Sequence, residues 1–308
     1  MVFSSLPFLF LFLTVVLLVS HILPFRFRNF FLLLANLVFY AYGEPVYVLI
    51  MIGSILVNFF AGLLMDKQST QGRRRAVLVV GIVLNLAALG VFKYAGLFVS
   101  TLREIPGLSS LPEVDIALPI GISFYTFQAV SYLIDVYWDD CAASHNLINF
   151  ASYISLFPQL IAGPIVRYKD VNEQLVSRRE TPTLFNSGVR LFVVGLAKKV
   201  LLANQFGMLW DAMSADPVAA GALGAWAGAC AYTLQIYFDF AGYSDMARGL
   251  GRMLGFEFCI NFNYPYISKS VTEFSPCPPG SGTMCISPWG ATGAASSASV
   301  STFWWCGP

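Results

Sequence analysis

The stretch Val46-Tyr-Val-Leu-Ile-Met-Ile-Gly-Ser-Ile-Leu-Val-Asn-Phe-Phe-Ala-Gly-Leu-Leu-Met65 decides the fold class. It runs for 20 residues without a charged side chain, and a helix of about 20 apolar residues crosses the hydrocarbon core of a bilayer. Basic residues follow it, beginning with Lys67. The stretch therefore predicts a membrane-spanning helix that ends at the water interface.

The composition of the whole chain agrees with this prediction. Of the 308 residues, 57% are hydrophobic and 11% are charged, whereas about a quarter of a typical globular chain is charged. So little charge excludes a disordered protein, and a net charge of +1 leaves no basic surface to attract nucleic acid. We expect an all-α, polytopic membrane helix bundle in one domain, with about eight to ten spans.

Three further apolar stretches predict the orientation of the first helices. They cover residues 6–23, 30–42 and 76–92. Cytoplasmic loops carry the excess of Lys and Arg, and the loops after the first and third spans contain Arg26, Arg28, Lys67, Arg73, Arg74 and Arg75. Both loops are therefore predicted inside and the N-terminus outside. The first stretch is expected to be retained, because no basic region precedes it.

Residues 118–137 and 147–161 are both apolar, yet we do not expect both to cross the membrane. The loop before them, which contains Glu113, is predicted outside. Two full crossings would also place the basic segment 167–179 outside, against the charge rule. One stretch is therefore predicted to be re-entrant or broken, which is tolerated at membrane depth inside protein or beside a wet cavity.

The later apolar sequence predicts two more spans and one surface helix. The spans cover about residues 191–203 and 219–238. Residues 244–256 carry apolar side chains at helical intervals with charged residues between them. We interpret this segment as an amphipathic helix that lies in the membrane interface.

Polar residues inside apolar spans are functional candidates by default, because they are costly there. One group lies in residues 118–128 and continues with Ser131, Tyr132 and Asp135. The second group lies in residues 232–245.

In the second group, Gln235 and Asp239 fall on one helix face, with Tyr232 and Tyr243 near the same stripe. Such a stripe can be polar contact between helices, worth about 1 kcal/mol per hydrogen bond. It can equally be the wall of a polar tunnel. Composition does not choose between the two.

Few other residues suit a common catalytic chemistry. Histidine is the obvious general base for acyl transfer, and we interpret both histidines, His21 and His145, as interfacial residues. Lys198 and Lys199 are interpreted as side chains that snorkel at the end of a span. The six cysteines show no paired spacing, no nucleophile elbow or P-loop occurs, and no metal site is predicted.

Five segments carry longer motifs. They are residues 118–137, Phe157-Pro-Gln-Leu-Ile-Ala-Gly-Pro-Ile-Val-Arg-Tyr168, Gly195-Leu-Ala-Lys-Lys199, Tyr237-Phe-Asp-Phe-Ala-Gly-Tyr-Ser-Asp-Met-Ala-Arg-Gly-Leu-Gly251 and Asn261-Phe-Asn-Tyr-Pro-Tyr266. In this order they resemble the membrane-bound O-acyltransferase family, and its alginate O-acetyltransferase subgroup in particular. The resemblance extends over residues 1–274.

The resemblance implies a helix bundle around a tunnel, in which an acyl group reaches an acceptor hydroxyl outside a bacterial cytoplasmic membrane. It implies acetyl transfer to an alginate-like extracellular polysaccharide, with polysaccharide-modification partner proteins, the lipid bilayer as surroundings and no nucleic acid. No bound cofactor is implied, and acetyl-CoA or an acyl carrier would supply the acetyl group as a substrate. The candidate tunnel-lining or supporting residues are Gln235, Asp239, Tyr243 and Asn263.

The histidines on which the family's reaction relies have no counterpart here. The first belongs to a motif that directly follows the equivalent of Thr272-Glu-Phe274, and this sequence has neither that histidine nor the second. We therefore name no catalytic residue and expect the chain as written to be inactive.

A shifted reading frame explains residues 275–308. The family's expected continuation is Trp-Phe-Arg-Asp-Tyr-Val-Tyr-Ile-Pro-Leu-Gly-Gly-Asn-Arg. Codons for it, with the first base dropped, translate as residues 280–293. We hypothesise that a small deletion left residues 1–274 as a C-terminally truncated bundle and residues 275–308 as a disordered tail. The alternative is a real, divergent tail rich in Gly, Ser and Pro.

A second functional hypothesis is a non-catalytic membrane partner or transporter whose polar stripe lines a solute path. Charged residues paired in mid-span would favour it. In the sequence, Asp239 has no basic residue within one helical turn.

Overall fold

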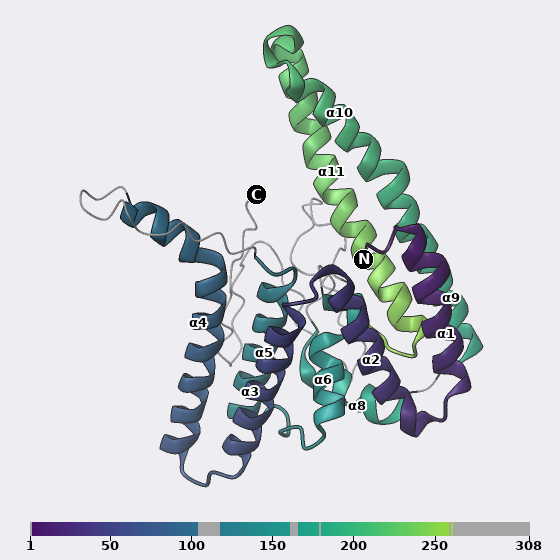
Figure 1. Cartoon of the computed structure of the whole chain (residues 1–308). Coiled ribbons are helices and arrows are strands. Elements are labelled where there is room, and N and C mark those ends of the chain that lie inside the picture. The colour runs from purple at the N-terminus through teal and green to yellow at the C-terminus, as the bar shows by residue number, and fades with distance from the viewer. Residues whose placement is uncertain (1, 104–117, 161–165, 179, 259, 261–308) are drawn as a thin grey trace, which may run out of the picture.

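The computed structural model describes residues 2–103, 118–160, 166–178, 180–258 and 260. All regular structure in these ranges is helical, which confirms the predicted all-α membrane protein (Figure 1). Asn263 and the proposed tail at residues 275–308 lie outside the described residues.

In chain order the elements are the π-helix η1 (Pro7–Phe12), α1 (Leu13–Ile22), α2 (Phe25–Gly43), α3 (Val48–Asp66), α4 (Gln71–Arg103), α5 (Ile122–Tyr137), α6 (Leu147–Ser155), α7 (Phe157–Leu160), α8 (Tyr168–Ser177), α9 (Pro182–Ala197), the π-helix η2 (Lys198–Ala203), α10 (Asn204–Ala215) and α11 (Pro217–Met253).

Three helical runs among the described residues are long and apolar enough to cross a membrane. They are α3, α4 and the run Pro182–Ala215 formed by α9, η2 and α10. The outward side chains of α4 are apolar, and Val79 and Val83 are half exposed, as expected of a face toward lipid. Fewer helices reach this length and apolarity than the eight to ten spans expected, because several apolar stretches form shorter or more polar helices.

The predicted break lies in residues 147–161. α5 is continuous, whereas α6 stops at Leu156, whose backbone leaves the helical region with a ψ of 107°. Asn29, near the start of α2, donates to Asn149 Oδ1 at 3.0 Å and to the Leu175 carbonyl at 2.7 Å. Asn149 is near the start of α6 and Leu175 is near the end of α8. The start of α6 and the end of α8 therefore lie at the same end of the bundle.

The basic loops that were predicted to share one side lie together at one end of the bundle. Arg28 Nη1 lies 2.6 Å from Glu180 Oε2, and Arg74 Nη2 lies 2.6 Å from Asp139 Oδ1. These pairs connect the starts of α2 and α4 with the loops that follow α8 and α5. The shared end agrees with the charge pattern, and its orientation toward the cytoplasm stays a prediction.

The run from α9 to α10 and helix α11 form a long antiparallel hairpin that projects beyond the other helices (Figure 1). Glycines let the two backbones touch. A Cβ atom on Gly195 would lie 2.6 Å from the Gly242 carbonyl oxygen, and one on Gly188 would lie 2.7 Å from the Gly249 carbonyl oxygen. Small residues at the contact are typical of helix pairs in membranes.

The prediction of a separate interfacial helix over residues 244–256 is wrong. These residues continue α11 as far as Met253. Met246 and Leu250 are fully buried, and α11 packs on α9. The helical period was correct, but it suits a helix that packs on another helix as well as one that lies on lipid.

An aromatic cluster connects the first residues of the chain with both parts of the molecule. Phe3, Phe8 and Phe39 are buried around Phe157 of α7. On its other side, Phe3 stacks on the Tyr243 ring of α11, with 4.7 Å between the ring centroids. The N-terminal segment therefore packs between the re-entrant segment and the hairpin.

Candidate functional site

The predicted polar stripe of α11 meets two consecutive lysines of η2. Lys199 Nζ donates to Asp239 Oδ1, and Lys198 Nζ donates to Asp245 Oδ2 at 2.6 Å. The interpretation of these lysines as snorkelling side chains is wrong, because both pair with carboxylates of the opposite helix. The pairs join residues 40 and 47 positions apart in the chain, so no local sequence pattern reports them.

The π-helical turn at η2 accompanies this pairing. Both lysines belong to it, and it continues α9 directly into α10. Such turns frequently occur at functional sites. The charged groups are partly covered, with side-chain exposures of 19% for Lys199 and 44% for Asp239. The arrangement is a partly shielded charge pair beside the second pair, Lys198–Asp245.

The rest of the stripe packs against α10 and the N-terminal segment. Gln235 lies against the backbone of α10, where a Cβ on Gly207 would be 2.9 Å from Gln235 Nε2. The Tyr232 ring lies 5.0 Å from that of Trp210, and Tyr243 stacks on Phe3. Over this length the stripe makes contact between helices, as one of the two interpretations expects.

The first polar group, in contrast, lies on α5, which packs on α3 and α4 and also contacts α6 and α8. Tyr125, Gln128, Tyr132 and Asp135 are all buried. The Tyr132 hydroxyl accepts a hydrogen bond from the Ser144 amide at 3.0 Å, and its ring lies on Phe150 and Tyr168. The two polar groups of the sequence therefore occupy separate parts of the molecule.

Two buried amides beside the first group were missed by sequence reasoning. Asn36 of α2 and Gln159 of α7 are 0% and 1% exposed. Asn36 Oδ1 accepts from the Phe157 amide at 3.1 Å, and Gln159 Nε2 donates to the Tyr153 carbonyl at 2.7 Å. The available signal was an amide within an otherwise mostly apolar stretch, which is weak on its own.

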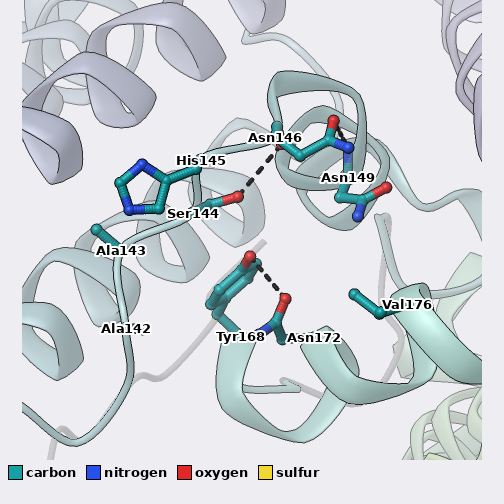
Figure 2. Close-up of a pocket in the computed structure, with 9 residues that line it drawn as sticks. All are labelled: Ala142, Ala143, Ser144, His145, Asn146, Asn149, Tyr168, Asn172 and Val176. Atoms are coloured by element: carbon teal, nitrogen blue, oxygen red, sulfur yellow. Dashed lines mark hydrogen bonds between the residues drawn. The ribbon is translucent and has the colours of Figure 1, made fainter.

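A surface pocket of about 300 Å³ lies at the basic end of the bundle (Figure 2). His145 stands at its edge, 72% exposed, with Nε2 3.3 Å from Asp66 Oδ2. Tyr168 donates to Asn172 Oδ1 at 2.9 Å within it. The pocket is lined by Ala142, Ala143, Ser144, His145, Asn146, Asn149, Tyr168, Asn172 and Val176.

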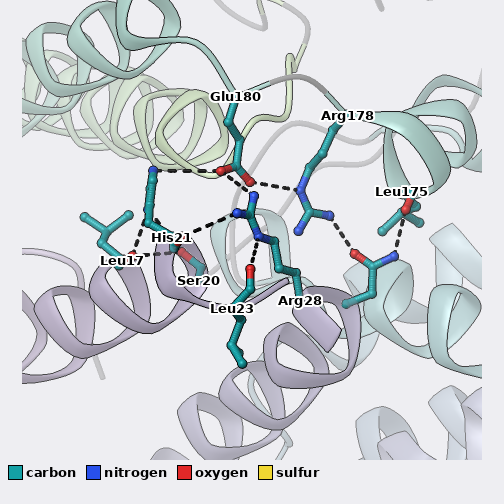
Figure 3. A network of polar contacts seen from close by, with 9 residues as sticks. Leu17, Ser20, His21, Leu23, Arg28, Leu175, Arg178 and Glu180 are labelled. Atoms are coloured by element: carbon teal, nitrogen blue, oxygen red, sulfur yellow. Dashed lines mark hydrogen bonds and ion pairs between the residues drawn. The ribbon is translucent and has the colours of Figure 1, made fainter. Parts of the chain in front are cut away.

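The other histidine belongs to a network of ion pairs around Glu180 (Figure 3). Glu180 Oε2 lies 2.6 Å from Arg28 Nη1 and 3.9 Å from His21 Nε2, and Glu180 Oε1 lies 3.5 Å from Arg178 Nε. Arg178 also covers the Phe256 ring at 4.8 Å, and burial lowers the pKa of its guanidinium. Neither histidine lies beside the α11 stripe, so neither is placed to act as a base there.

The acidic and sulfur-containing side chains do not form a metal centre in the described ranges. No group of three or more His, Cys, Asp or Glu residues there is arranged to hold a metal ion. The chemistry that the described residues offer is that of neutral amides, phenols and charge pairs.

A sequence model of the MBOAT, membrane-bound O-acyltransferase family matches residues 139–276. The chain is 46% identical over 280 residues to a Pseudomonas aeruginosa protein named probable alginate O-acetylase AlgI, over 89% of this chain and 53% of that protein. It is 32% identical over 280 residues to a peptidoglycan O-acetyltransferase of Helicobacter pylori, over 80% and 52% of the two chains. It is 32% identical over 162 residues to a teichoic acid D-alanyltransferase of Streptococcus thermophilus, over 50% and 39%.

The chain spans about half the length of the first two of these relatives. The matched segment 139–276 includes α6, α7, α8 and the described hairpin from α9 to α11. The apolar helical architecture, the order of the motifs and these matches agree: residues 139–276 match the membrane-bound O-acyltransferase family, and the chain is similar to a probable alginate O-acetylase over 89% of its length.

Proposed function

We propose that this chain forms the helical scaffold of an enzyme that transfers acetyl groups to hydroxyls of an alginate-like polysaccharide outside the cell. The observation that carries the proposal is the 46% identity to a probable alginate O-acetylase over 89% of the chain. In such a transfer the acceptor hydroxyl oxygen attacks the carbonyl carbon of the donor. A new ester forms, the bond to the leaving group breaks, and the hydroxyl proton passes to a base.

The donor approaches, in this proposal, from the basic end of the bundle. The loops at this end, which are joined by the Arg28–Glu180 and Arg74–Asp139 ion pairs, carry the excess of Lys and Arg that marks a cytoplasmic face. Acetyl-CoA or an acyl carrier would deliver the acetyl group there as a substrate. Partner proteins would act on the polysaccharide at the opposite, outer end, where we also place the N-terminus.

The orientation has a direct test in the cytoplasmic membrane of a bacterium. Single cysteines at Lys169 and Glu113, in a chain whose own cysteines are replaced by serine, should react with an impermeant maleimide from opposite sides. Labelling of both from the same side would contradict the topology.

The stripe residues are proposed to support the reaction rather than to carry it. Asp239 and Lys199 hold α11 against η2, while Gln235, Tyr243 and Asn263 would line or support the path of the acetyl group. The base would be the histidine of the family motif. His21 and His145 are engaged with Glu180 and Asp66, so we propose that the 308-residue chain alone transfers no acetyl group.

Expression in a bacterium that makes alginate but lacks its own O-acetylase tests this proposal. One strain receives the 308-residue chain, and a second receives residues 1–274 joined to the remainder of a homologous O-acetylase. We expect ester-linked acetate on the secreted polymer in the second strain only, and its loss when the motif histidine is replaced by alanine. A joined chain that reaches the membrane without acetylating the polymer would contradict the proposed activity.

A second candidate function is a solute path through the hairpin. The Lys199–Asp239 pair favours it, because a charge pair between apolar helices is the feature expected of such a path. The test uses vesicles that contain residues 1–274 joined to the remainder of a homologous O-acetylase. Uptake of a solute into these vesicles without acetyl transfer would support this function over the first.

A further inference from the structure

The break between α6 and α7 is held by two amide side chains that each use only half of their hydrogen-bonding capacity. Asn36 Oδ1 accepts from the Phe157 amide, and Gln159 Nε2 donates to the Tyr153 carbonyl. The other halves, Asn36 Nδ2 and Gln159 Oε1, are buried and have no hydrogen-bond partner among the described residues. A side-chain amide offers both donors and an acceptor, so each amide still requires a partner.

Three more buried groups on the facing helices share this condition. The Tyr40 hydroxyl, the Tyr125 hydroxyl and Gln128 Oε1 also have no hydrogen-bond partner in the described part of the chain. Their residues are 4%, 1% and 2% exposed. None of the three carries a charge at neutral pH.

The chain brings these five groups together at the end of the re-entrant segment. Tyr40 follows Asn36 by one helical turn on α2, and its hydroxyl lies beside that of Tyr125 without meeting the geometry of a hydrogen bond. The start of α5 touches the end of α7, since a Cβ on Gly121 would lie 2.8 Å from the Leu160 carbonyl oxygen. Contacts therefore connect α2 with α7, α2 with α5, and α5 with α7 near the residues that carry these groups.

The composition of this polar cluster, formed by Asn36, Tyr40, Tyr125, Gln128 and Gln159, defines what it can bind. Its free groups include an amide donor, two amide acceptors and two hydroxyls that can do either. None of the five residues is charged, and the charge of Glu44, which reaches Tyr40 from one helical turn away, would repel an anionic headgroup. A ligand must be small and neutral, and must both donate and accept.

We propose that the polar cluster is an internal hydration site, in which ordered water bridges α2, α5 and α7 at the tip of the re-entrant segment. A buried water makes about two to four hydrogen bonds to groups that otherwise lack partners, and the cluster supplies five such groups. Irregular backbone at membrane depth is tolerated inside protein or beside water. The inference concerns the resting protein and holds whether or not the proposed acetyl transfer is correct.

X-ray radiolytic footprinting of the purified 308-residue chain in detergent tests the site, because hydroxyl radicals form from water beside a side chain. Tyr40 and Tyr125 should be modified several times faster than Tyr132 and Tyr153. These two controls are equally buried, but their hydroxyls are paired with the Ser144 amide and the Val166 carbonyl. Equal, slow modification of all four tyrosines would overturn the proposal.

Tyr125→Phe provides a second and independent measurement. Without water, this change removes an unpaired hydroxyl and raises the thermal midpoint or leaves it unchanged. With water, it leaves the bridging molecule and its other partners short of a hydrogen bond, so the midpoint falls. Tyr153→Phe, which breaks a direct hydrogen bond, should lower the midpoint in either case. A higher or unchanged midpoint for Tyr125→Phe beside a lower one for Tyr153→Phe would contradict the site.

Discussion

The bundle of η1 to α8 and the hairpin of α9 to α11 are stabilised in different ways. In the bundle, large rings such as Phe39, Phe157 and Tyr132 fill the interior, and buried amides satisfy the broken backbone. In the hairpin, glycines bring two backbones into contact, and lysine–aspartate pairs fix their alignment. We therefore expect the bundle to be destabilised most by removing a buried ring or amide. The hairpin should be destabilised most by adding a side chain at one of its contact glycines.

The largest effect should come from adding a methyl group to the hairpin. In Gly195→Ala the new Cβ would lie 2.6 Å from the Gly242 carbonyl and the Met246 amide, so the helices must separate. We expect a loss of about 3 kcal/mol in the free energy of unfolding, measured as the thermal midpoint in detergent.

The control for this change is Gly90→Ala in α4. No atom lies within 4 Å of the position of its Cβ, and alanine favours a helix over glycine by up to about 1 kcal/mol. The control should keep or raise the midpoint. Equal losses in the two variants would show that the glycine contacts do not hold the hairpin.

Removal of the Asn29 side chain from the bundle should have the next largest effect on the free energy of unfolding. Asn29 contacts Asn149, the Leu175 carbonyl and Arg178. Asn29→Ala removes all three partly buried hydrogen bonds, while Arg178 keeps its pair with Glu180. We expect a loss of about 2 kcal/mol, since an unpaired buried group costs about 1–3 kcal/mol. The exposed Asn204→Ala is the matched control, and it should change the thermal midpoint little.

A smaller effect is expected for the charge pair of the hairpin. Lys199→Met leaves Asp239 without its partner, but the carboxylate is 44% exposed, so the loss should be about 1 kcal/mol. Adding Asp239→Leu to Lys199→Met should recover most of it. Lys67→Met serves as the control on an exposed lysine. Additive losses in the double variant would argue against the pair.

The smallest effect is a pH dependence at the basic end. The Arg74 guanidinium holds the pKa of Asp139 below its ordinary value. A depressed carboxyl pKa stabilises the folded state above the unfolded pKa, and this contribution is lost as the pH falls through the folded pKa. The thermal midpoints of wild type and Asp139→Asn should differ at pH 7 and converge under acidic conditions. A constant difference would contradict the pairing.

Sequence reasoning reached the parts of the fold that depend on apolar period and charge. The helix at residues 46–65 and the need for a break before the basic segment 167–179 follow from these patterns. The assignment of residues 244–256 failed because a buried and an interfacial face have the same period. The Lys198–Asp245 pair depends on how two distant helices align, which no local pattern contains.

The candidate site was predictable to a smaller extent for a related reason. Tyr125 and Gln128 stood out as polar residues within an apolar span, but their neighbours Asn36 and Gln159 come from other parts of the chain. An amide in an apolar stretch is common, and only the three-dimensional structure shows that Asn36 reaches the break before α7. The role of Asn263 stays a prediction.

The contact between Phe3 and Tyr243 also constrains how the molecule is made. Phe3 is synthesised near the beginning and Tyr243 comes 240 residues later, an interval of roughly 10–50 s at a rate of about 5–20 residues per second. During that time one face of the first residues has no ring to stack on. Insertion of the hairpin therefore supplies the ring against which Phe3 packs.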